Sequence, residues 1–400
     1  MPRLLDTIRR QVGAGSVFFL VSGGVDSTVA FVLCARALPK ERVLGLYVDT
    51  GLMRKGETDE LRDNLRTLGL ESRLLVRDES KRFMRALKGV VEPERKRKII
   101  GKLFVDVQSD AMREHGIDAA HWLLGQGTIY PDTIESGGVS GQAALIKTHH
   151  NRVPEIRELM EQGRVIEPLA EFYKDQVRAI GIELGLGSRL TDRWPFPGPG
   201  LAIRCLCNAG GSDTPVEQLD LSPMGVSEFQ AFRLPLKSVG VQGDGRTYRT
   251  VAAITGKLLY EPLQNLSSRL CNESDEFNRV VYFVRGVVGL EHATLAAGGM
   301  EPERIARLRE ADHVVRRLLE TEGLSEAVWQ FPVVLVPVRL KGGESIVLRP
   351  VNSTDGMTAN FARLPEALIQ RMAEDLLKIG GIDAVFLDIT DKPPATIEWE

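Results

Sequence analysis

The run Phe18-Phe19-Leu20-Val21-Ser22-Gly23-Gly24-Val25-Asp26-Ser27-Thr28 decides the fold of the first part of this chain. An apolar strand leads into a tight Ser-Gly-Gly turn, and the apolar residues after Thr28 predict a helix that begins at once. Two glycines allow the backbone to approach an anion closely, and Ser22, Ser27 and Thr28 add hydroxyl donors. The N–H groups and the positive dipole end of the helix favour phosphate. The sequence therefore predicts a phosphate-binding loop.

This loop is distinct from the P-loop of kinases and GTPases. No G-x-x-x-x-G-K-S/T pattern occurs anywhere in the chain, whereas the P-loop needs a lysine after its last glycine. The alternative is an ordinary turn between a strand and a helix, with no ligand. The full S-G-G-x-D-S pattern between an expected strand and an expected helix favours phosphate binding.

The composition is typical of a globular protein with hydrophobic cores. The chain of 400 residues is 43% hydrophobic and 26% charged, which predicts two or three domains. Its net charge of −3 argues against nucleic acid or an anionic membrane as a partner. No signal peptide and no apolar run long enough to cross a bilayer is found. The four cysteines are few and indicate a reducing cytoplasm.

Expected strands and helices alternate through the first half. The segments are a strand at 43–49, a helix at 58–68, strands at 72–76, 121–128 and 165–169, and a helix from Lys174. Such alternation predicts an α/β domain with a doubly wound parallel sheet and a ligand at the carboxyl ends of its strands. Gly23, Gly24 and Asp49 all lie at such ends, so we expect them to share one crevice.

Four consecutive cations, Arg95-Lys96-Arg97-Lys98, stand in an otherwise acidic chain. They fit the solvated first turn of a surface helix. They equally fit a helix that turns one arginine inward towards an anion, because the apolar Ile99-Ile100-Gly101 follows directly. Composition leaves both interpretations open.

Three further patterns have less specific meanings. The polar stretch 126–151 suits a lid over a phosphate-rich substrate. The pair His149-His150 suggests a metal, but adjacent side chains diverge and no further ligand stands at the right spacing. Cys205-Leu206-Cys207 is not a C-x-x-C motif, and two small apolar residues on one buried strand face is the favoured interpretation.

More motifs follow the loop in a fixed order. They are Tyr47 to Leu52, Lys96 to Gly101, Gln126 to Ser136, Ile146 to Asn151, Glu167 to Leu169, Lys174 to Arg178, Pro195 to Leu201, Ser238 to Arg246 and Lys392 to Glu400. Together with the loop they resemble the ATP-pyrophosphatase part of the GMP synthetase family, collinearly over nearly the whole chain. The loop alone is less specific, because asparagine, NAD and argininosuccinate synthetases also carry it. The resemblance implies an adenine-nucleotide alpha-hydrolase-like fold for the first part.

The resemblance also implies an ATP-driven amination of xanthosine 5′-monophosphate (XMP). ATP adenylylates the C2 oxygen of XMP, pyrophosphate leaves, and ammonia then expels AMP to give GMP. Magnesium is expected on the phosphates, with Asp26 as a direct or water-mediated ligand. Lys174 is expected to steady the phosphate charge; without the resemblance it would be interpreted as a helix-surface lysine.

The family pattern places the two nucleotides on separate sets of residues. ATP contacts are implied at Ser22, Gly23, Gly24, Val25, Asp26, Ser27, Thr28 and Asp49. XMP contacts are implied at Arg97, Asp244, Gln330, Lys392, Ile397 and Glu398. Arg97 and Lys392 suit the nucleotide phosphate, whereas Asp244 and Glu398 suit hydroxyl or ring N–H donors.

One departure from the family concerns the source of ammonia. A glutaminase domain with a Gly-x-Cys-x-Gly elbow and a His-x-Glu partner usually precedes the synthetase, and neither pattern occurs here. We therefore expect no glutamine hydrolysis by this chain. Ammonia is expected from solution or from a separate amidotransferase subunit.

The second half contains two similar segments. Each carries a Leu-Pro-Leu or Val-Pro-Val strand, a glycine turn, a second strand, a helix and a third strand, a β-β-α-β order that predicts an α+β module. In short bacterial members this module occurs once and dimerises, whereas longer members carry it twice. We expect the two segments to pack on each other within one chain as an internal pseudo-dimer, so that the protein is a monomer. The alternatives are a homodimer, or two unrelated α+β segments.

The expected division is an ATP-pyrophosphatase domain at 1–194, a linker at 195–204, a first repeat at 205–298 and a second repeat with an XMP-binding tail at 299–400. Two other functions compete. Enzymes that thiolate tRNA share the loop, but they need a nucleophilic cysteine pair and a basic surface. A non-catalytic nucleotide sensor would be expected to lose Asp26, Lys174 or the terminal motif, and all of these are present.

Overall fold

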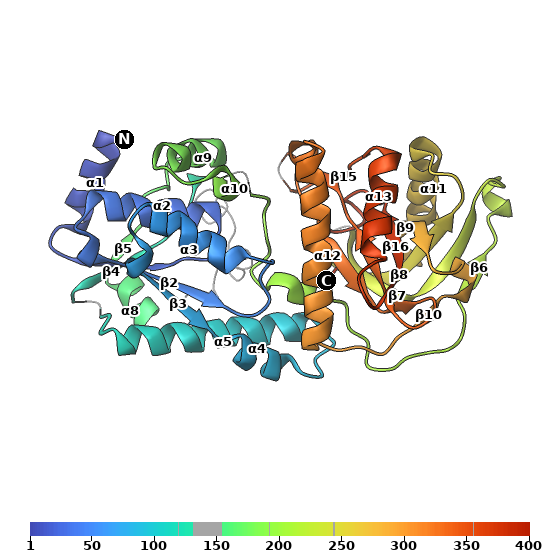
Figure 1. Cartoon of the computed structure of the whole chain (residues 1–400), viewed down its shortest axis with the longest axis horizontal. Helices are drawn as coiled ribbons and strands as arrows, with labels where there is room; N and C mark the ends of the chain where they lie inside the picture. The colour runs from blue at the N-terminus through green and yellow to red at the C-terminus, as the bar shows by residue number, and fades with distance from the viewer. Residues whose placement is uncertain (119, 131–153, 192, 243–244, 355) are drawn as a thin grey trace. The chain divides into compact units, whose positions relative to one another are not determined.

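The protein divides into two compact units (Figure 1). The computed structural model describes residues 1–118, 120–130, 154–191, 193–242, 245–354 and 356–400. One unit comprises Met1–Ala86 and Arg97–Gly198, and the other comprises Leu87–Lys96 and Pro199–Glu400. The boundary after Gly198 falls inside the expected linker. The segment Leu87–Lys96 differs from the expected division because it packs with the second unit.

The first unit is built on a five-stranded sheet in the order β3-β2-β1-β4-β5. Its strands are β1 (Ser16–Leu20), β2 (Val43–Asp49), β3 (Leu74–Asp78), β4 (Trp122–Gly125) and β5 (Val165–Ile166). All neighbouring strands pair in parallel, as the sequence predicts. The helices are α1 (Pro2–Val12), α2 (Val25–Ala37), α3 (Glu57–Thr67), α4 (Ser80–Leu87), α5 (Pro93–Glu114), α8 (Pro154–Glu161), α9 (Lys174–Glu183) and α10 (Ser188–Thr191). Figure 1 shows α2 and α9 on one face of the sheet and α4 and α5 on the other.

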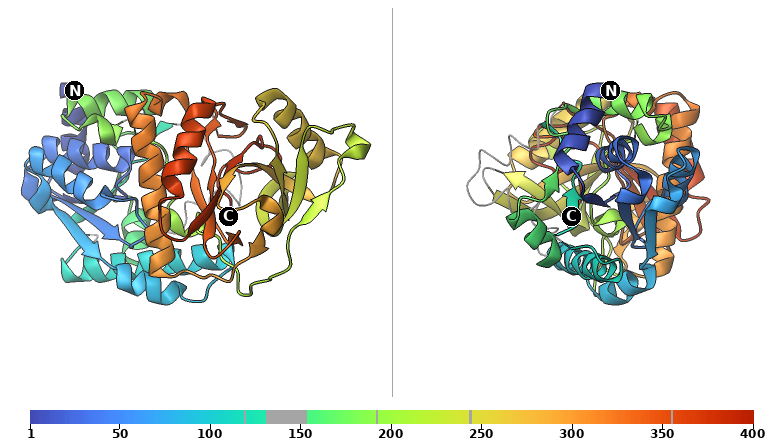
Figure 2. Two further views of the ribbon diagram at one scale, coloured as in Figure 1. Left: turned by 45° about the vertical axis from the view of Figure 1, so that its right-hand side comes forward. Right: turned by 90° about the vertical axis from the view of Figure 1, so that its left-hand side faces the viewer.

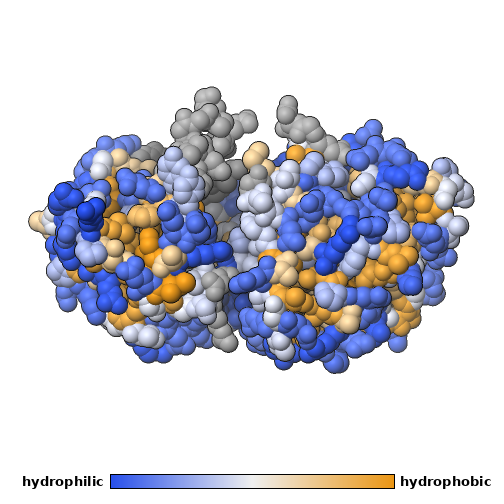
Figure 3. Space-filling view, turned by 90° about the horizontal axis from the view of Figure 1, so that it is seen from above, coloured by the Kyte–Doolittle hydropathy of each residue, from blue (hydrophilic) through white to orange (hydrophobic). Residues whose placement is uncertain are grey.

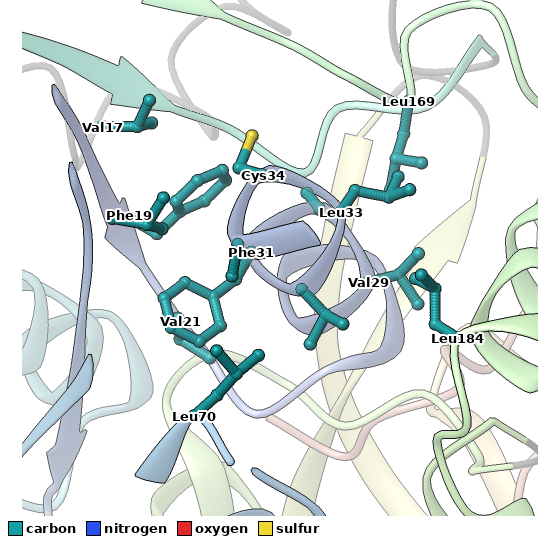
Figure 4. Close-up of a cluster of buried hydrophobic side chains, with 14 of the residues drawn as sticks. Val17, Phe19, Val21, Val29, Phe31, Leu33, Cys34, Leu70, Leu169 and Leu184 are labelled. Atoms are coloured by element: carbon teal, nitrogen blue, oxygen red, sulfur yellow. The ribbon is translucent and has the colours of Figure 1, made fainter. Parts of the chain in front are cut away.

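Helix α2 is the centre of the first core. Ten of its side chains are buried, from Val25 to Ala37, which is typical of a helix enclosed on most sides. Phe31 packs edge-on against Phe19 of β1, with ring centroids 5.8 Å apart (Figure 4). Asp26, Ser27 and Thr28 lie in the first turn of α2, and its other charged residue, Arg36, lies in the last turn. This core therefore holds the amino end of α2 firmly at the end of β1.

The second unit contains a seven-stranded mixed sheet in the order β11-β13-β16-β9-β8-β7-β6. Its strands are β6 (Glu217–Leu219), β7 (Gln230–Gln242), β8 (Gly245–Thr255), β9 (Phe277–Gly286), β11 (Val333–Val336), β13 (Glu344–Leu348) and β16 (Ile382–Asp388). Short pairs are formed by β10 (Thr294–Leu295) with β12 (Val338–Arg339), and by β14 (Val351–Asn352) with β15 (Asn360–Phe361). Its helices are α11 (Tyr260–Asn272), α12 (Pro302–Thr321) and α13 (Glu366–Leu376).

The two β-β-α-β segments have the same pairing directions. In one, β7 pairs antiparallel with β8, and β8 pairs parallel with β9 across α11. In the other, β11 pairs antiparallel with β13, and β13 pairs parallel with β16 across α13. The segments join where β16 pairs antiparallel with β9. The expected β-β-α-β order is therefore present twice, around the β9–β16 pair.

The carboxy-terminal tail takes part in the core of this sheet. Helices α11, α12 and α13 lie side by side along the sheet in Figures 1 and 2. A separate buried cluster includes Val251, Val281 and Phe386 from neighbouring strands together with Trp399 from the tail. Because alternate strand residues point to opposite faces, this cluster covers one face of the sheet. Trp399 thus anchors the last residues against the strands.

Across the described ranges, no helix has both the length and the apolar character needed to span a membrane. On the face shown in Figure 3, hydrophobic residues gather within each unit and hydrophilic residues surround them.

Candidate functional site

The loop after β1 lies where the order of the strands in the sheet reverses. From β1 the chain proceeds to β2 and β3 on one side, and then to β4 and β5 on the other. The loop after β1 therefore lies at a topological switch point, where α/β sheets bind ligands. The turn after β4 reaches the same place: a Cβ on Gly127 would lie 2.7 Å from the amide nitrogen of Ser27. Only glycine fits this close approach.

Hydroxyl groups inside the loop fix its shape. The Ser22 and Ser27 hydroxyl oxygens lie 3.0 Å apart, and the Gly24 amide donates to Ser22 Oγ at 3.3 Å. Thr28 Oγ1 donates to the Gly24 carbonyl at 2.8 Å. Gly23 has φ +78°, a conformation that favours glycine. The loop is thus preformed before any ligand arrives.

The amino end of α2 offers its first N–H groups to an anion. The first hydrogen bond of the helix runs from the Thr28 amide to the Gly24 carbonyl at 3.2 Å. No side chain caps this end of α2 in the described structure. The amides of Val25, Asp26 and Ser27 precede the first intrahelical bond, so they have no helical partner. Together with the dipole of α2 they can bind an anion, and the amino end of α2 is below called the phosphate cradle for this expected role.

The two expected catalytic residues meet beside this cradle. Lys174, the first residue of α9, donates from Nζ to Asp26 Oδ1 at 2.8 Å and to Oδ2 at 2.6 Å. The side chains are 41% and 28% exposed, so solvent and ligands can reach both. A side chain of α9 therefore delivers a cation to the first turn of α2. The expected function of Lys174 remains a prediction, and the structure adds that its ammonium group lies beside the uncapped amino end of α2.

Asp49 has a different environment. It ends β2, its Oδ1 accepts the Gly51 amide at 2.9 Å, and its Oδ2 accepts the Thr58 hydroxyl at 2.7 Å. These bonds fix the turn after β2 and the start of α3. The side chain is half-buried at the same sheet edge as the loop.

Arg193 holds the loop from outside and was missed by the sequence analysis. Its Nη1 donates to the Gly23 carbonyl at 2.8 Å, and its Nη2 pairs with the buried carboxylate of Glu57. Arg193 lies two residues before the expected Pro-rich linker. This proximity to a motif was the available signal, because the partners of Arg193 are remote in sequence.

In the second unit, two expected XMP contacts meet. Gln330 Nε2 donates to Glu398 Oε1 at 3.1 Å. Lys392 lies elsewhere on the tail, where its Nζ donates to the Gly356 carbonyl at 2.5 Å. Ile397 is half-buried beside Glu398 in the chain. Asp244 lies outside the described residues, as do the histidine pair and most of the expected lid.

Of the four consecutive cations Arg95 to Lys98, one is buried and the others are half-buried or exposed. Lys96, rather than an arginine, turns inward, and its side chain is 0% exposed. Its Nζ donates to Glu400 Oε2 at 2.5 Å and to the carbonyls of Ala202 and Cys205 at 3.2 and 2.8 Å. Arg97 is half-buried on the next position of α5. The anion that one cation of the run meets is thus the protein's own tail.

A buried carboxylate organises the rest of the tail. Asp388 at the end of β16 accepts from Arg279 at 2.5 Å, from Arg349 at 3.0 Å and from the Trp399 indole at 3.0 Å. Arg279 also lies over the Trp399 ring and donates to the Thr396 carbonyl at 3.1 Å. Burial lowers the pKa of Arg349 to about 10, which Asp388 opposes. Charges from both β-β-α-β segments therefore fix the tail.

The interpretation of the two cysteines as an apolar pair on a strand is wrong. Neither residue belongs to one of the sheet strands. Cys205 is buried, whereas Cys207 is half-buried and its Sγ lies 3.6 Å from Arg304 Nη1. A hydrogen bond with Cys205, and the positive charges of Lys96 and Arg304, lower the pKa of Cys207 to about 6. Cys207 also lines a cavity of about 410 Å³ with Arg233, Lys237 and Tyr248.

Comparisons with known proteins find a family model that matches part of each half of the chain. The family model described as "NAD synthase" matches residues 3–97, and the model described as "GMP synthase C terminal domain" matches residues 317–399. A probable glutamine-hydrolyzing GMP synthase from Leptospira interrogans is 44% identical over 389 residues, which is 96% of this chain and 64% of that protein. Over nearly its whole length, this chain is therefore similar to GMP synthases.

Other GMP synthases give the same relationship. The glutamine-hydrolyzing GMP synthases of Dictyostelium discoideum and Caldicellulosiruptor saccharolyticus are 33% and 34% identical over 460 and 405 residues. These matches cover 98% and 99% of this chain, but 64% and 60% of those proteins. The chain therefore spans less than two thirds of these relatives. An ammonia-dependent NAD synthetase structure from Campylobacter jejuni is 15% identical, with a TM-score of 0.34 over 49% of this chain and 76% of that one. A likeness this distant carries no argument.

Proposed function

We propose that this GMP synthase relative aminates XMP to GMP at the expense of ATP, which is split into AMP and pyrophosphate. The observation that carries the proposal is the pairing of Lys174 with Asp26 at the uncapped amino end of α2, next to the Ser-Gly-Gly loop. The C2 oxygen of XMP is a poor leaving group. Adenylylation makes this oxygen part of an AMP leaving group, which ammonia can displace from C2.

The loop would hold the two outer phosphates of ATP. The amides at the start of α2 supply donors without reorganisation. The hydroxyls of Ser22, Ser27 and Thr28 would exchange their hydrogen bonds within the loop for bonds to phosphate. Held in this way, pyrophosphate becomes the leaving group and the α-phosphorus remains open to attack. The Nζ of Lys174 would stabilise negative charge that grows on the pyrophosphate oxygens as this bond breaks.

Asp26 is the proposed ligand for Mg²⁺ that arrives with ATP. Among the described residues, no cluster of three His, Cys, Asp or Glu side chains could hold a metal unaided. Mg²⁺ commonly takes one carboxylate plus substrate phosphates and waters, and the single loop carboxylate fits that mode. Lys174 occupies one direction on each oxygen of Asp26, which leaves about two of four acceptor directions. Bound there, Mg²⁺ would neutralise phosphate charge.

XMP would bind to Arg97, Asp244, Gln330, Lys392, Ile397 and Glu398. Support within the second unit comes from the contact between Gln330 and Glu398 and from the strong anchoring of the tail around them. Glu398 can only accept hydrogen bonds while it is ionised, which suits a ring N–H or a hydroxyl of the nucleotide. Lys392 would exchange its carbonyl partner for the nucleotide phosphate.

Ammonia would come from solution or from a separate glutamine amidotransferase subunit. The two β-β-α-β segments, joined through β9 and β16, support an internal pseudo-dimer in which each segment covers the surface that a single copy would expose. We propose that the chain acts as a monomer, with a homodimer as the alternative. Sedimentation at micromolar concentration distinguishes the two.

The deciding experiment mixes the protein with ATP, magnesium, XMP and ammonium. We expect GMP, AMP and pyrophosphate in equal amounts; ADP in place of AMP would exclude the proposal, and no turnover would favour a nucleotide sensor. Asp26→Asn should reduce pyrophosphate release at least about 100-fold. XMP binding should be unaffected, and the stability cost should stay at about 1 kcal/mol because both side chains of the ion pair are partly exposed to solvent.

The matched control is Asp59→Asn. This carboxylate is exposed in the first turn of α3, outside the phosphate loop. An equal loss of pyrophosphate release in both variants would mean that Asp26 has no special role.

A further inference from the structure

Glu398 is held by more groups than a surface carboxylate needs. Arg204, the last residue of the expected linker, donates from Nε to Oε2 at 2.9 Å and from Nη2 to Oε1 at 2.6 Å. Gln330 Nε2 donates to Oε1 at 3.1 Å. A bidentate guanidinium fixes both the position and the plane of a carboxylate. The Glu398 side chain therefore has one defined orientation.

Burial of the charged Arg204 guanidinium costs free energy unless nearby carboxylates compensate its charge. Its side chain is 0% exposed, and its other neighbour is the buried carboxylate of Asp312, 3.9 Å from Nη1. Burial alone would lower the pKa of Arg204, but the charge and hydrogen bonds of Glu398, and the charge of Asp312, raise it above the ordinary value. Asp312 has a second cation, Arg316, at 3.0 Å. The charges of Arg204 and Arg316 balance those of Glu398 and Asp312. Because Arg316 already offsets Asp312, neutralising Asp312 does not by itself explain why Arg204 is present.

The Glu398 carboxylate has few acceptor directions left for a ligand. A carboxylate has about four acceptor directions, and the donors from Arg204 and Gln330 occupy three of them. The open direction is on Oε2, and the side chain is 19% exposed, so one acceptor remains within reach of a ligand. A group held in this way accepts one hydrogen bond from one direction.

We propose that Arg204 is a positioning residue, which orients the Glu398 carboxylate so that Oε2 accepts a single N–H or O–H donor of XMP. This inference rests on the proposed function, because it needs XMP at the tail. Arg204 does not itself contact the nucleotide in this scheme. Its effect passes through Glu398, and XMP recognition depends on it while ATP recognition does not.

The test is Arg204→Lys, which keeps the charge but loses the two parallel hydrogen bonds. We expect KM for XMP to rise about tenfold or more, with KM for ATP and kcat within about twofold of wild type, because a hydrogen bond to a charged group contributes on that scale. The matched control is Arg316→Lys. It makes the same change beside the same Asp312 without touching Glu398, and KM for XMP should stay at the wild-type value.

A double variant excludes a purely structural effect. Arg204→Gln combined with Glu398→Gln removes both charges of the contact, so no isolated charge is buried. If Arg204 acts through Glu398, KM for XMP in this double variant should equal that of Glu398→Gln alone. A further tenfold loss would overturn the inference, as would equal effects of Arg204→Lys and Arg316→Lys. A wild-type protein that forms no GMP would instead defeat the proposed function.

Discussion

Replacement of Lys96 by methionine tests how the tail is held. The ammonium group is 0% exposed and the Glu400 side chain is 3% exposed, so neither partner can turn to water in the native state. Removal of Lys96 leaves the Glu400 carboxylate buried without its cation, and leaves the carbonyls of Ala202 and Cys205 without this donor. Loss of one partner of a buried ion pair costs about 3–5 kcal/mol. We expect the second unit to lose that much free energy of unfolding.

The double variant Lys96→Met with Glu400→Gln should recover part of this loss. A neutral glutamine no longer buries a charge, and replacement of a whole buried pair is often close to neutral. The two carbonyls still lack their donor, so we expect a residual cost of about 1–3 kcal/mol. The double variant should therefore be more stable than Lys96→Met alone.

Urea unfolding followed by tryptophan fluorescence measures this cost. In a background with Trp122→Phe and Trp194→Phe, the signal comes from Trp329 and the fully buried Trp399, which both lie in the second unit. Lys88→Met is the matched control, because Lys88 is exposed and belongs to the same segment of the second unit as Lys96; it should change stability by less than about 0.5 kcal/mol. A cost below about 1 kcal/mol for Lys96→Met, the value typical of exposed pairs, would refute the reasoning.

Two further predictions concern the loop and the cysteines. Gly127→Ala should raise KM for ATP about tenfold or more, because the added Cβ would lie 2.7 Å from the Ser27 amide nitrogen. The control is Gly210→Ala, whose added Cβ would have no atom within 4 Å, and it should leave KM for ATP unchanged. Iodoacetamide should alkylate Cys207 at a rate that levels off above about pH 7, because a pKa of about 6 makes the thiol ionise as the pH rises through that value. Burial raises the pKa of Cys271 to about 12, so its rate should still rise at pH 9; mass spectrometry separates the two, and equal profiles would contradict the assignment.

Local patterns in the sequence were sufficient for the architecture. The apolar run from Phe18 to Val21, the glycine pair and the helix after Val25 predict β1, the loop and α2, because strand, turn and helix formation depend on residues close in the chain. The two Pro-centred strands predict the two β-β-α-β segments for the same reason. The resemblance of successive motifs pointed to the family, and the comparisons with relatives agree with it.

The tertiary structure alone decided which side chains meet. Lys174 and Asp26 are 148 residues apart, and Arg204 and Glu398 are 194 apart. No local pattern distinguishes Lys96 from Arg97, yet the packing of α5 buries Lys96 and leaves Arg97 half-buried. Periodicity states which face a residue occupies, but not which remote partner reaches that face. Ion pairs between distant segments depend on the packing of whole elements. The sequence therefore determined the loop and, through the resemblance, suggested Lys174, but only the folded chain showed that Lys174 meets Asp26.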